Sequence, residues 1–92
     1  MEKILHVVSE ELRLDNYDFE SIKNIMKKVH PNLEGRRTRA IAAGILYYYV
    51  TINHIPMINE EISRRVGVKP VTTGKLYREV RRIIENKKIQ CL

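Results

Sequence analysis

Residues 36–52 read RRTRAIAAGILYYYVTI and give the strongest structural signal in the sequence. Residues 40–59, which follow the arginines, contain no Asp, Glu, Lys or Arg. If the stretch forms a helix, apolar side chains lie on every side of it. A helix that is apolar all round is central, with other helices packed against it. The small residues 42–44 (AAG) permit a close crossing. The apolar run ends near Ile52, too short to span a bilayer, so we predict a buried core helix that begins near Arg36–Arg39.

Two amphipathic segments precede this stretch. Apolar residues recur at three- and four-residue spacing through residues 1–14 and again through residues 18–30. Asp18 is the expected N-cap of the second helix, and Pro31 ends it. The sequence thus predicts two helices before the central one, each with one buried face.

Two further helices are predicted after it. The first covers about residues 59–66, with Asn59 as its expected N-cap and Gly67 at its end. The second starts near Pro70, a residue favoured at the first helical position. With no strand pattern and only 92 residues, the chain is predicted to be all-α, with five helices in one domain over residues 1–92.

The last two helices have the pattern of a helix-turn-helix, in which the second helix enters the DNA major groove. Lys75, Arg78 and Arg82 follow each other at i, i+3 and i+7, so they share one face of that helix. An ordinary solvated face is an equally good reading of this stripe alone. Glu79 and Glu85 could also pair with Arg82 and Arg81 and weaken the local field.

The charge distribution supports a polyanionic partner. The net charge is +6, but residues 1–35 carry five Lys/Arg against seven Asp/Glu, whereas residues 36–92 carry twelve against four. Nucleic acid, an anionic membrane surface or simple solubility would each fit such a polarised basic half. We favour duplex DNA, with candidate contacts at the following positions: Arg36, Arg37 and Arg39 before the central helix; Arg64, Arg65 and Lys69 around the turn; Thr72, Thr73, Lys75, Arg78 and Arg82 on the last helix.

Other classes of function find little support. Cys91 has no partner cysteine, the three histidines are dispersed, and Ser9 has no recognisable base and acid partner. We therefore expect no disulfide, no metal site, no cofactor and no catalysis. Tyr47 and Tyr77 are expected to pack in the core rather than to stack on RNA bases. The N-terminus does not have the pattern of a secretory signal, so we expect a cytoplasmic protein, nucleoid-associated in a prokaryotic host.

The segment GRRTRAIAAGILY (35–47) resembles the third helix of a transcription factor IIB repeat, a family with an archaeal branch. IP (55–56), EEI (60–62) and VGV (66–68) are similar to the family's fourth helix and turn, and VT (71–72) and YREV (77–80) are similar to its fifth helix. The resemblance implies one five-helix, cyclin-like repeat. The family also has a second repeat and a zinc ribbon, whereas here we expect one repeat and, with a single cysteine, no ribbon. Gly74 stands where the family's second repeat has a base-reading arginine.

The resemblance implies a DNA-binding transcription regulator or initiation-factor-like protein. It also implies a TATA-binding protein as a partner, and a lone repeat can form a homodimer to recover the missing half. The alternative is a protein-interaction module of cyclin-like fold, which binds a component of the transcription machinery without reading DNA. No membrane association is expected under either hypothesis.

Overall fold

The computed structural model describes residues 1–33 and 35–90, with side chains as far as Glu85 in the last helix. These residues form five α-helices and a single 3-10 turn, with no strand among them: α1 (Glu2–Glu11), α2 (Asn16–Val29), η1 (His30–Asn32), α3 (Thr38–Ile52), α4 (Asn59–Val66) and α5 (Pro70–Gln90). The all-helical prediction is confirmed, with helix bounds that move by a few residues. No helix in this part of the chain is long and apolar enough to cross a membrane.

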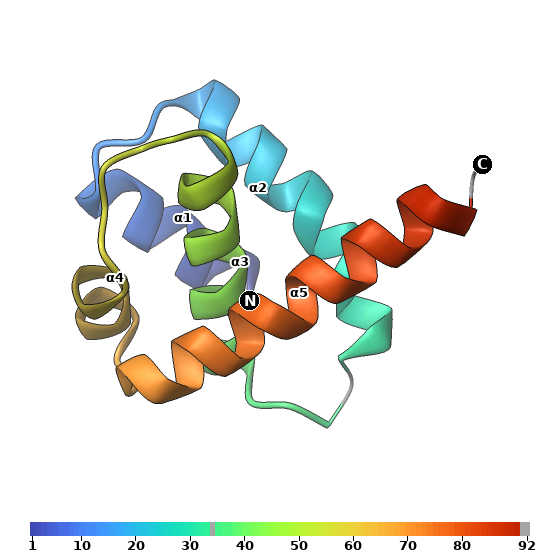
Figure 1. Cartoon of the computed structure of the whole chain (residues 1–92). Helices are drawn as coiled ribbons and strands as arrows, with labels where there is room; N and C mark the ends of the chain where they lie inside the picture. Colours follow the sequence, from blue (N-terminus) through green and yellow to red (C-terminus); the bar gives the residue numbers. More distant parts are fainter. Residues whose placement is uncertain (34, 91–92) are drawn as a thin grey trace.

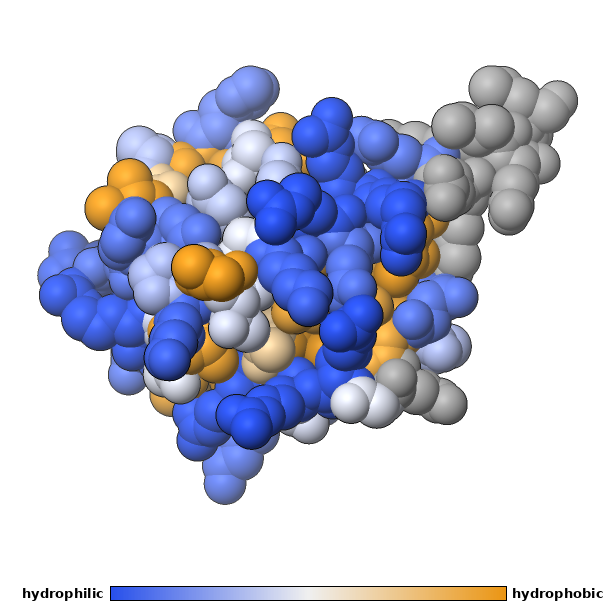
Figure 2. All heavy atoms as spheres, turned by 60° about the horizontal axis from the view of Figure 1, so that its bottom comes forward, coloured by the Kyte–Doolittle hydropathy of each residue, from blue (hydrophilic) through white to orange (hydrophobic). Residues whose placement is uncertain are grey.

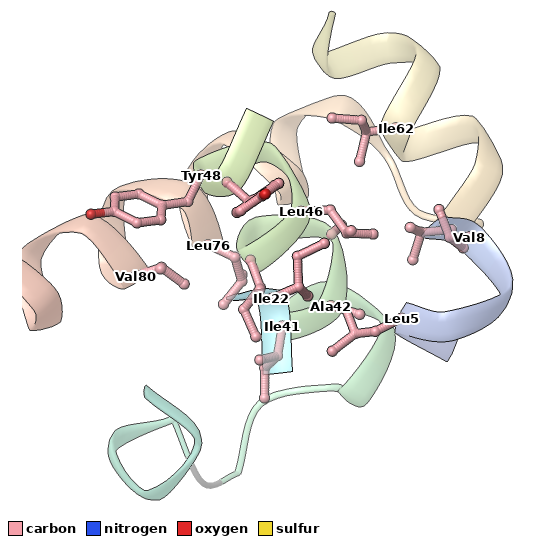
Figure 3. Close-up of a cluster of buried hydrophobic side chains, with 14 of the residues drawn as sticks. Leu5, Val8, Ile22, Ile41, Ala42, Leu46, Tyr48, Ile62, Leu76 and Val80 are labelled. Carbon is pink, nitrogen blue, oxygen red and sulfur yellow. The ribbon is translucent and has the colours of Figure 1, made fainter. Parts of the chain in front are cut away.

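Helix α3 lies at the centre of the molecule, as its sequence predicts. Figure 1 shows α5 crossing one side of α3, α1 and α2 on the other side, and α4 beside the start of α5. Ten of the fifteen residues of α3 are buried, and they lie all around the helix. Side chains from all the other α-helices meet them in one core (Figure 3), including Leu5, Ile22, Ile62 and Val80.

The crossing of α3 and α5 depends on Gly44. A Cβ atom placed on Gly44 would lie 2.6 Å from Leu76 Cβ and 2.8 Å from the Leu76 carbonyl carbon. Carbon atoms in contact normally stay about 3.5–4.0 Å apart, so only glycine permits this approach. The close crossing holds the first half of α5 firmly against the central helix.

Two predicted helix caps are wrong. The N-cap of α2 is Asp15, whose side chain accepts a hydrogen bond from the Asp18 backbone N–H at 2.8 Å. Asp18 is the other half of this capping box and accepts from the Asp15 N–H at 3.2 Å. Helix α4 has Ile58 as its N-cap, with no side-chain hydrogen bond there. The Asn59 side chain is engaged elsewhere, in the packing of α4 against α5.

A buried polar chain joins α4 to α5. The Ser63 and Thr73 hydroxyls lie 2.6 Å apart, and both residues are at most 1% exposed. Ser63 also donates to Asn59 Oδ1 at 2.7 Å, while Asn59 Nδ2 donates to the Pro70 carbonyl at 3.0 Å. Buried polar groups that satisfy one another in this way favour one packing geometry over others. The angle between α4 and α5 is therefore specified by hydrogen bonds as well as by apolar packing.

The turn between α4 and α5 is as short as the sequence predicts. Gly67 ends α4 with φ +90°, a conformation that residues with a Cβ rarely adopt. The Val68 N–H donates back to the Ser63 carbonyl at 3.0 Å and closes the end of the helix. Helix α5 begins at Pro70, three residues after Gly67.

Candidate nucleic-acid interface

A hollow lies between the segment that leads into α3 and the start of α5. Its volume is about 800 Å³ and it opens to solvent. Its cationic lining residues come from both segments: Arg36, Arg37, Lys69 and Lys75. No acidic residue is among the described residues that line it. Figure 2 shows the molecule from this side, where hydrophilic side chains surround apolar ones. Folding thus brings two basic clusters, about thirty positions apart in the chain, to one concave surface.

The lining of the hollow is otherwise apolar or small. Ala40, Val68, Val71 and Leu76 contribute apolar atoms, and Gly35, Gly67 and Thr72 complete the wall. Val71 is the most exposed large apolar residue in the part of the chain that the structure describes, at 81%. Val71 is not among the DNA contacts expected from the sequence. The signal that could have found it is an apolar residue at the start of a helix that follows a short turn, a position that reaches base edges in helix-turn-helix proteins.

The α5 stripe, Lys75, Arg78 and Arg82, runs outward from the hollow along the exposed side of the helix. All three side chains are exposed, and no ion pair to a described residue is found for any of them. Lys75 belongs to both features, since it also lines the hollow. The hollow and the stripe therefore form one continuous basic surface.

One of the two expected ion pairs of α5 forms, and the other is replaced by a contact with a distant residue. Glu79 binds Arg36 with 2.5 Å between Oε1 and Nη2, across 43 positions of sequence, and not Arg82. Arg81 does pair with Glu85, at 2.9 Å, as expected, and this hydrogen bond raises the pKa of Arg81. The Arg82 guanidinium is therefore not neutralised by Glu79, whereas the charge of Arg36 is partly offset by that carboxylate.

Arg39 has a structural contact that the sequence did not indicate. Its Nη1 donates to the Val66 carbonyl at 2.8 Å, so the guanidinium binds the C-terminal end of α4. A cation at this end of a helix interacts favourably with the helix dipole and satisfies an orphan carbonyl. Arg39 thus ties the start of α3 to the turn. The adjacent Arg37, the N-cap of α3, is exposed, and no ion pair to a described residue is found for it.

Arg64 and Arg65 face solvent on α4 but are not free charges. Both pair with Glu61, one turn earlier in the same helix, and Arg65 also lies 4.0 Å from Glu11 of α1. Neither lines the hollow. These two arginines are the weakest members of the candidate set.

Thr72 and Thr73, although adjacent in the chain, have different environments in the structure. Thr72 is partly exposed and lines the hollow. Thr73 is fully buried, and its hydroxyl contacts Ser63. Including Thr73 among the surface contacts is therefore wrong, because at position 73 the helix turns its side chain toward α4. Its role is to hold α5 in place.

The tyrosines of α3 pack largely as expected. Tyr48 and Tyr49 are buried, while Tyr47 and Tyr77 are half-buried with their ring centres 4.9 Å apart. Burial, together with the hydrogen bond from its hydroxyl to Asp18, raises the pKa of Tyr49 to about 12. These rings contribute to the core and to the contact of α3 with α5 rather than to the basic surface.

The described residues contain no group of three or more His, Cys, Asp or Glu side chains placed to hold a metal ion. Cys91 lies outside the described residues. Comparisons with protein-family models, with curated proteins and with solved structures gave no match to this chain.

Proposed function

We propose that this protein is a DNA-binding transcription regulator that uses α4 and α5 as a helix-turn-helix in a cyclin-like domain. The observation that carries the proposal is the continuous basic surface formed by the hollow and the α5 stripe. Arg37, Lys69, Lys75, Arg78 and Arg82 lie on it, with no ion pair to a described residue. Clustered unpaired cations beside an exposed helix are what binding to duplex phosphates requires.

The local geometry supports the same assignment. The two helices meet at a turn closed by Gly67, and the Ser63–Thr73 contact holds α5 against α4. In a helix-turn-helix the first turn of the second helix reaches base edges, and later basic residues bind phosphate. By this rule Val71, Thr72 and Lys75 are the base-contacting candidates, and Arg78 and Arg82 bind the backbone.

The resemblance of roughly residues 35–86 to a transcription factor IIB repeat is the second support. It extends the proposal to a protein partner, a TATA-binding protein, and to a homodimer that brings two such repeats together. We propose accordingly that a TATA-binding protein increases the affinity for a TATA-containing duplex. Equal affinity with and without that protein would remove this partner while leaving DNA binding itself intact.

A salt titration of duplex affinity tests the proposed function. Each neutralised phosphate adds about −0.9 to the slope of log affinity against log salt concentration. Arg78→Ala is expected to weaken binding to all duplex sequences and to flatten this slope by about one unit. Polyglutamate serves as a competitor that carries negative charge without duplex structure, and it should displace the protein poorly from DNA.

Two control variants make the titration specific. Arg81→Ala removes an arginine from the same helix, but one that is paired with Glu85. Lys3→Ala removes an exposed cation from the acidic half of the chain. Both should retain the wild-type slope. If Arg78→Ala behaves like these two variants, α5 is not the DNA-binding element.

A further inference from the structure

The apolar part of the hollow has no use in phosphate binding. Ala40, Val68, Val71 and Leu76 line it together, and a sugar–phosphate backbone offers no large apolar group to cover them. The volume of about 800 Å³ lies within the range of roughly 300–1,000 Å³ found for sites that enclose a specific ligand. The occupant that fits this lining must combine an apolar group with negative charge.

We propose that the hollow docks an acidic peptide segment of a partner protein, with a large apolar side chain of that segment inserted between α3 and α5. The argument is charge complementarity. Four cationic residues line the hollow together with the apolar ones, and no acidic residue lines it among the described residues. Aromatic and large aliphatic side chains that enter such a pocket are the usual anchors of protein–protein recognition.

The electrostatics of the rim suit carboxylates in particular. Arg37, Lys69 and Lys75 have no ion pair to a described residue, and Arg36 keeps donors beyond the one that binds Glu79. Arg37 is also the N-cap of α3, which has no side-chain cap, so the first N–H groups of that helix are open to an acceptor. A peptide with carboxylates on both sides of its apolar residue would meet a cation on either wall.

The peptide site overlaps the proposed DNA-binding surface but does not include all of it. Arg78 and Arg82 lie beyond the hollow and do not line it, while Val68 and Val71 do. This proposal goes beyond the proposed function and does not depend on it. Val71, Thr72 and Lys75 belong to both surfaces, so the Val71 variant is measured with peptide and with duplex DNA.

The experiment measures binding of two labelled peptides by fluorescence anisotropy. In the first peptide, aspartates flank a central Phe-Leu pair; in the second, the same aspartates flank a Ser-Ser pair. The Phe-Leu peptide is expected to bind at least about tenfold more tightly, which corresponds to the burial of one large apolar side chain. Equal affinity would show that only charge is recognised and would overturn the proposal.

A pair of matched variants locates the binding. Val71→Ser removes apolar atoms from the hollow, and Val7→Ser makes the same change at an exposed valine of α1, which does not line it. Val71→Ser should weaken binding of the Phe-Leu peptide about threefold to tenfold, and Val7→Ser should leave it unchanged. Both valines are exposed, so neither change removes core packing, and circular dichroism checks this.

Two further outcomes, both measured on the variants, contradict the proposal. Peptide affinity could be the same in Val71→Ser and Val7→Ser, in which case the hollow is not the docking site. Alternatively, Val71→Ser could weaken duplex DNA binding while leaving peptide binding intact, in which case the hollow serves DNA binding alone. Arg82→Ala, measured with both ligands, should weaken DNA binding and spare peptide binding.

Discussion

Gly44→Ala should destabilise the protein, whereas the same substitution at Gly74 should stabilise it. Both glycines lie inside helices, α3 and α5, so both gain helix propensity on replacement by alanine, about 1 kcal/mol. They differ in what the added methyl group meets. At Gly74 the nearest atom is Asn59 Nδ2 at 3.7 Å, an ordinary contact. At Gly44 the nearest atoms are Leu76 Cβ at 2.6 Å and the Leu76 carbonyl carbon at 2.8 Å.

The magnitude follows from the overlap at Gly44. Normal carbon contacts are about 3.5–4.0 Å, so α3 and α5 would have to separate by roughly 1 Å at their crossing. Neither clashing atom is the far end of a flexible side chain, so local rotation cannot relieve the contact. Overpacking of this kind costs about 1–3 kcal/mol, and separating the two helices loosens the packing of Leu76 and Val80 in addition. The loosened packing offsets the gain in helix propensity, so we expect a net loss of about 1–3 kcal/mol.

Thermal and urea denaturation of the two variants measure this difference. For a domain of this size, 1 kcal/mol corresponds to a change in Tm of about 4–8 °C. Gly44→Ala should therefore melt below wild type by about 5–20 °C, and Gly74→Ala above it by a few degrees. If Gly44→Ala is as stable as Gly74→Ala, the two helices do not cross as closely as described and the reasoning is refuted.

Three further predictions concern the same core. Ala43→Leu should cost about 1–3 kcal/mol in urea denaturation, since Ala43 is fully buried in the central helix; an unchanged midpoint would contradict the central placement of α3. Thr73→Val, which keeps the side-chain shape but removes a hydrogen bond to the buried Ser63 hydroxyl, should cost about 1–2 kcal/mol, whereas full stability would show that this contact is dispensable. The pKa of Tyr49 is about 12 in the folded protein, against an ordinary 10, so the protonated hydroxyl stabilises the folded state relative to the unfolded state. Its contribution is complete below pH 10 and is lost as the pH rises through 12; Tyr49→Phe should flatten the fall in stability over that window, and an unaltered pH profile would exclude Tyr49 as its source.

The sequence by itself determined the helical framework. The charge-free stretch before Asn59 predicted α3 as the core helix, and Gly67 and Pro70 predicted the end of α4 and the start of α5. These signals are local. The apolar pattern of α3, the left-handed conformation of Gly67 and the fixed φ of Pro70 each depend on a few neighbouring residues in the chain. Even here the caps at Asp18 and Asn59 were assigned wrongly, because several polar residues near a helix start can serve and the packing of α4 on α5 recruits Asn59 elsewhere.

The tertiary structure alone decided which charged residues meet. Glu79 pairs with Arg36, from a different part of the chain, and so leaves Arg82 available; Thr73 points into the interface with α4, away from solvent. The hollow itself exists because α5 crosses α3 at Gly44 and carries its first turn to the segment before α3. The physical reason is that contacts between distant residues depend on the angle and separation at which helices cross. Those quantities are set by the summed packing of the core, and no short stretch of sequence encodes them.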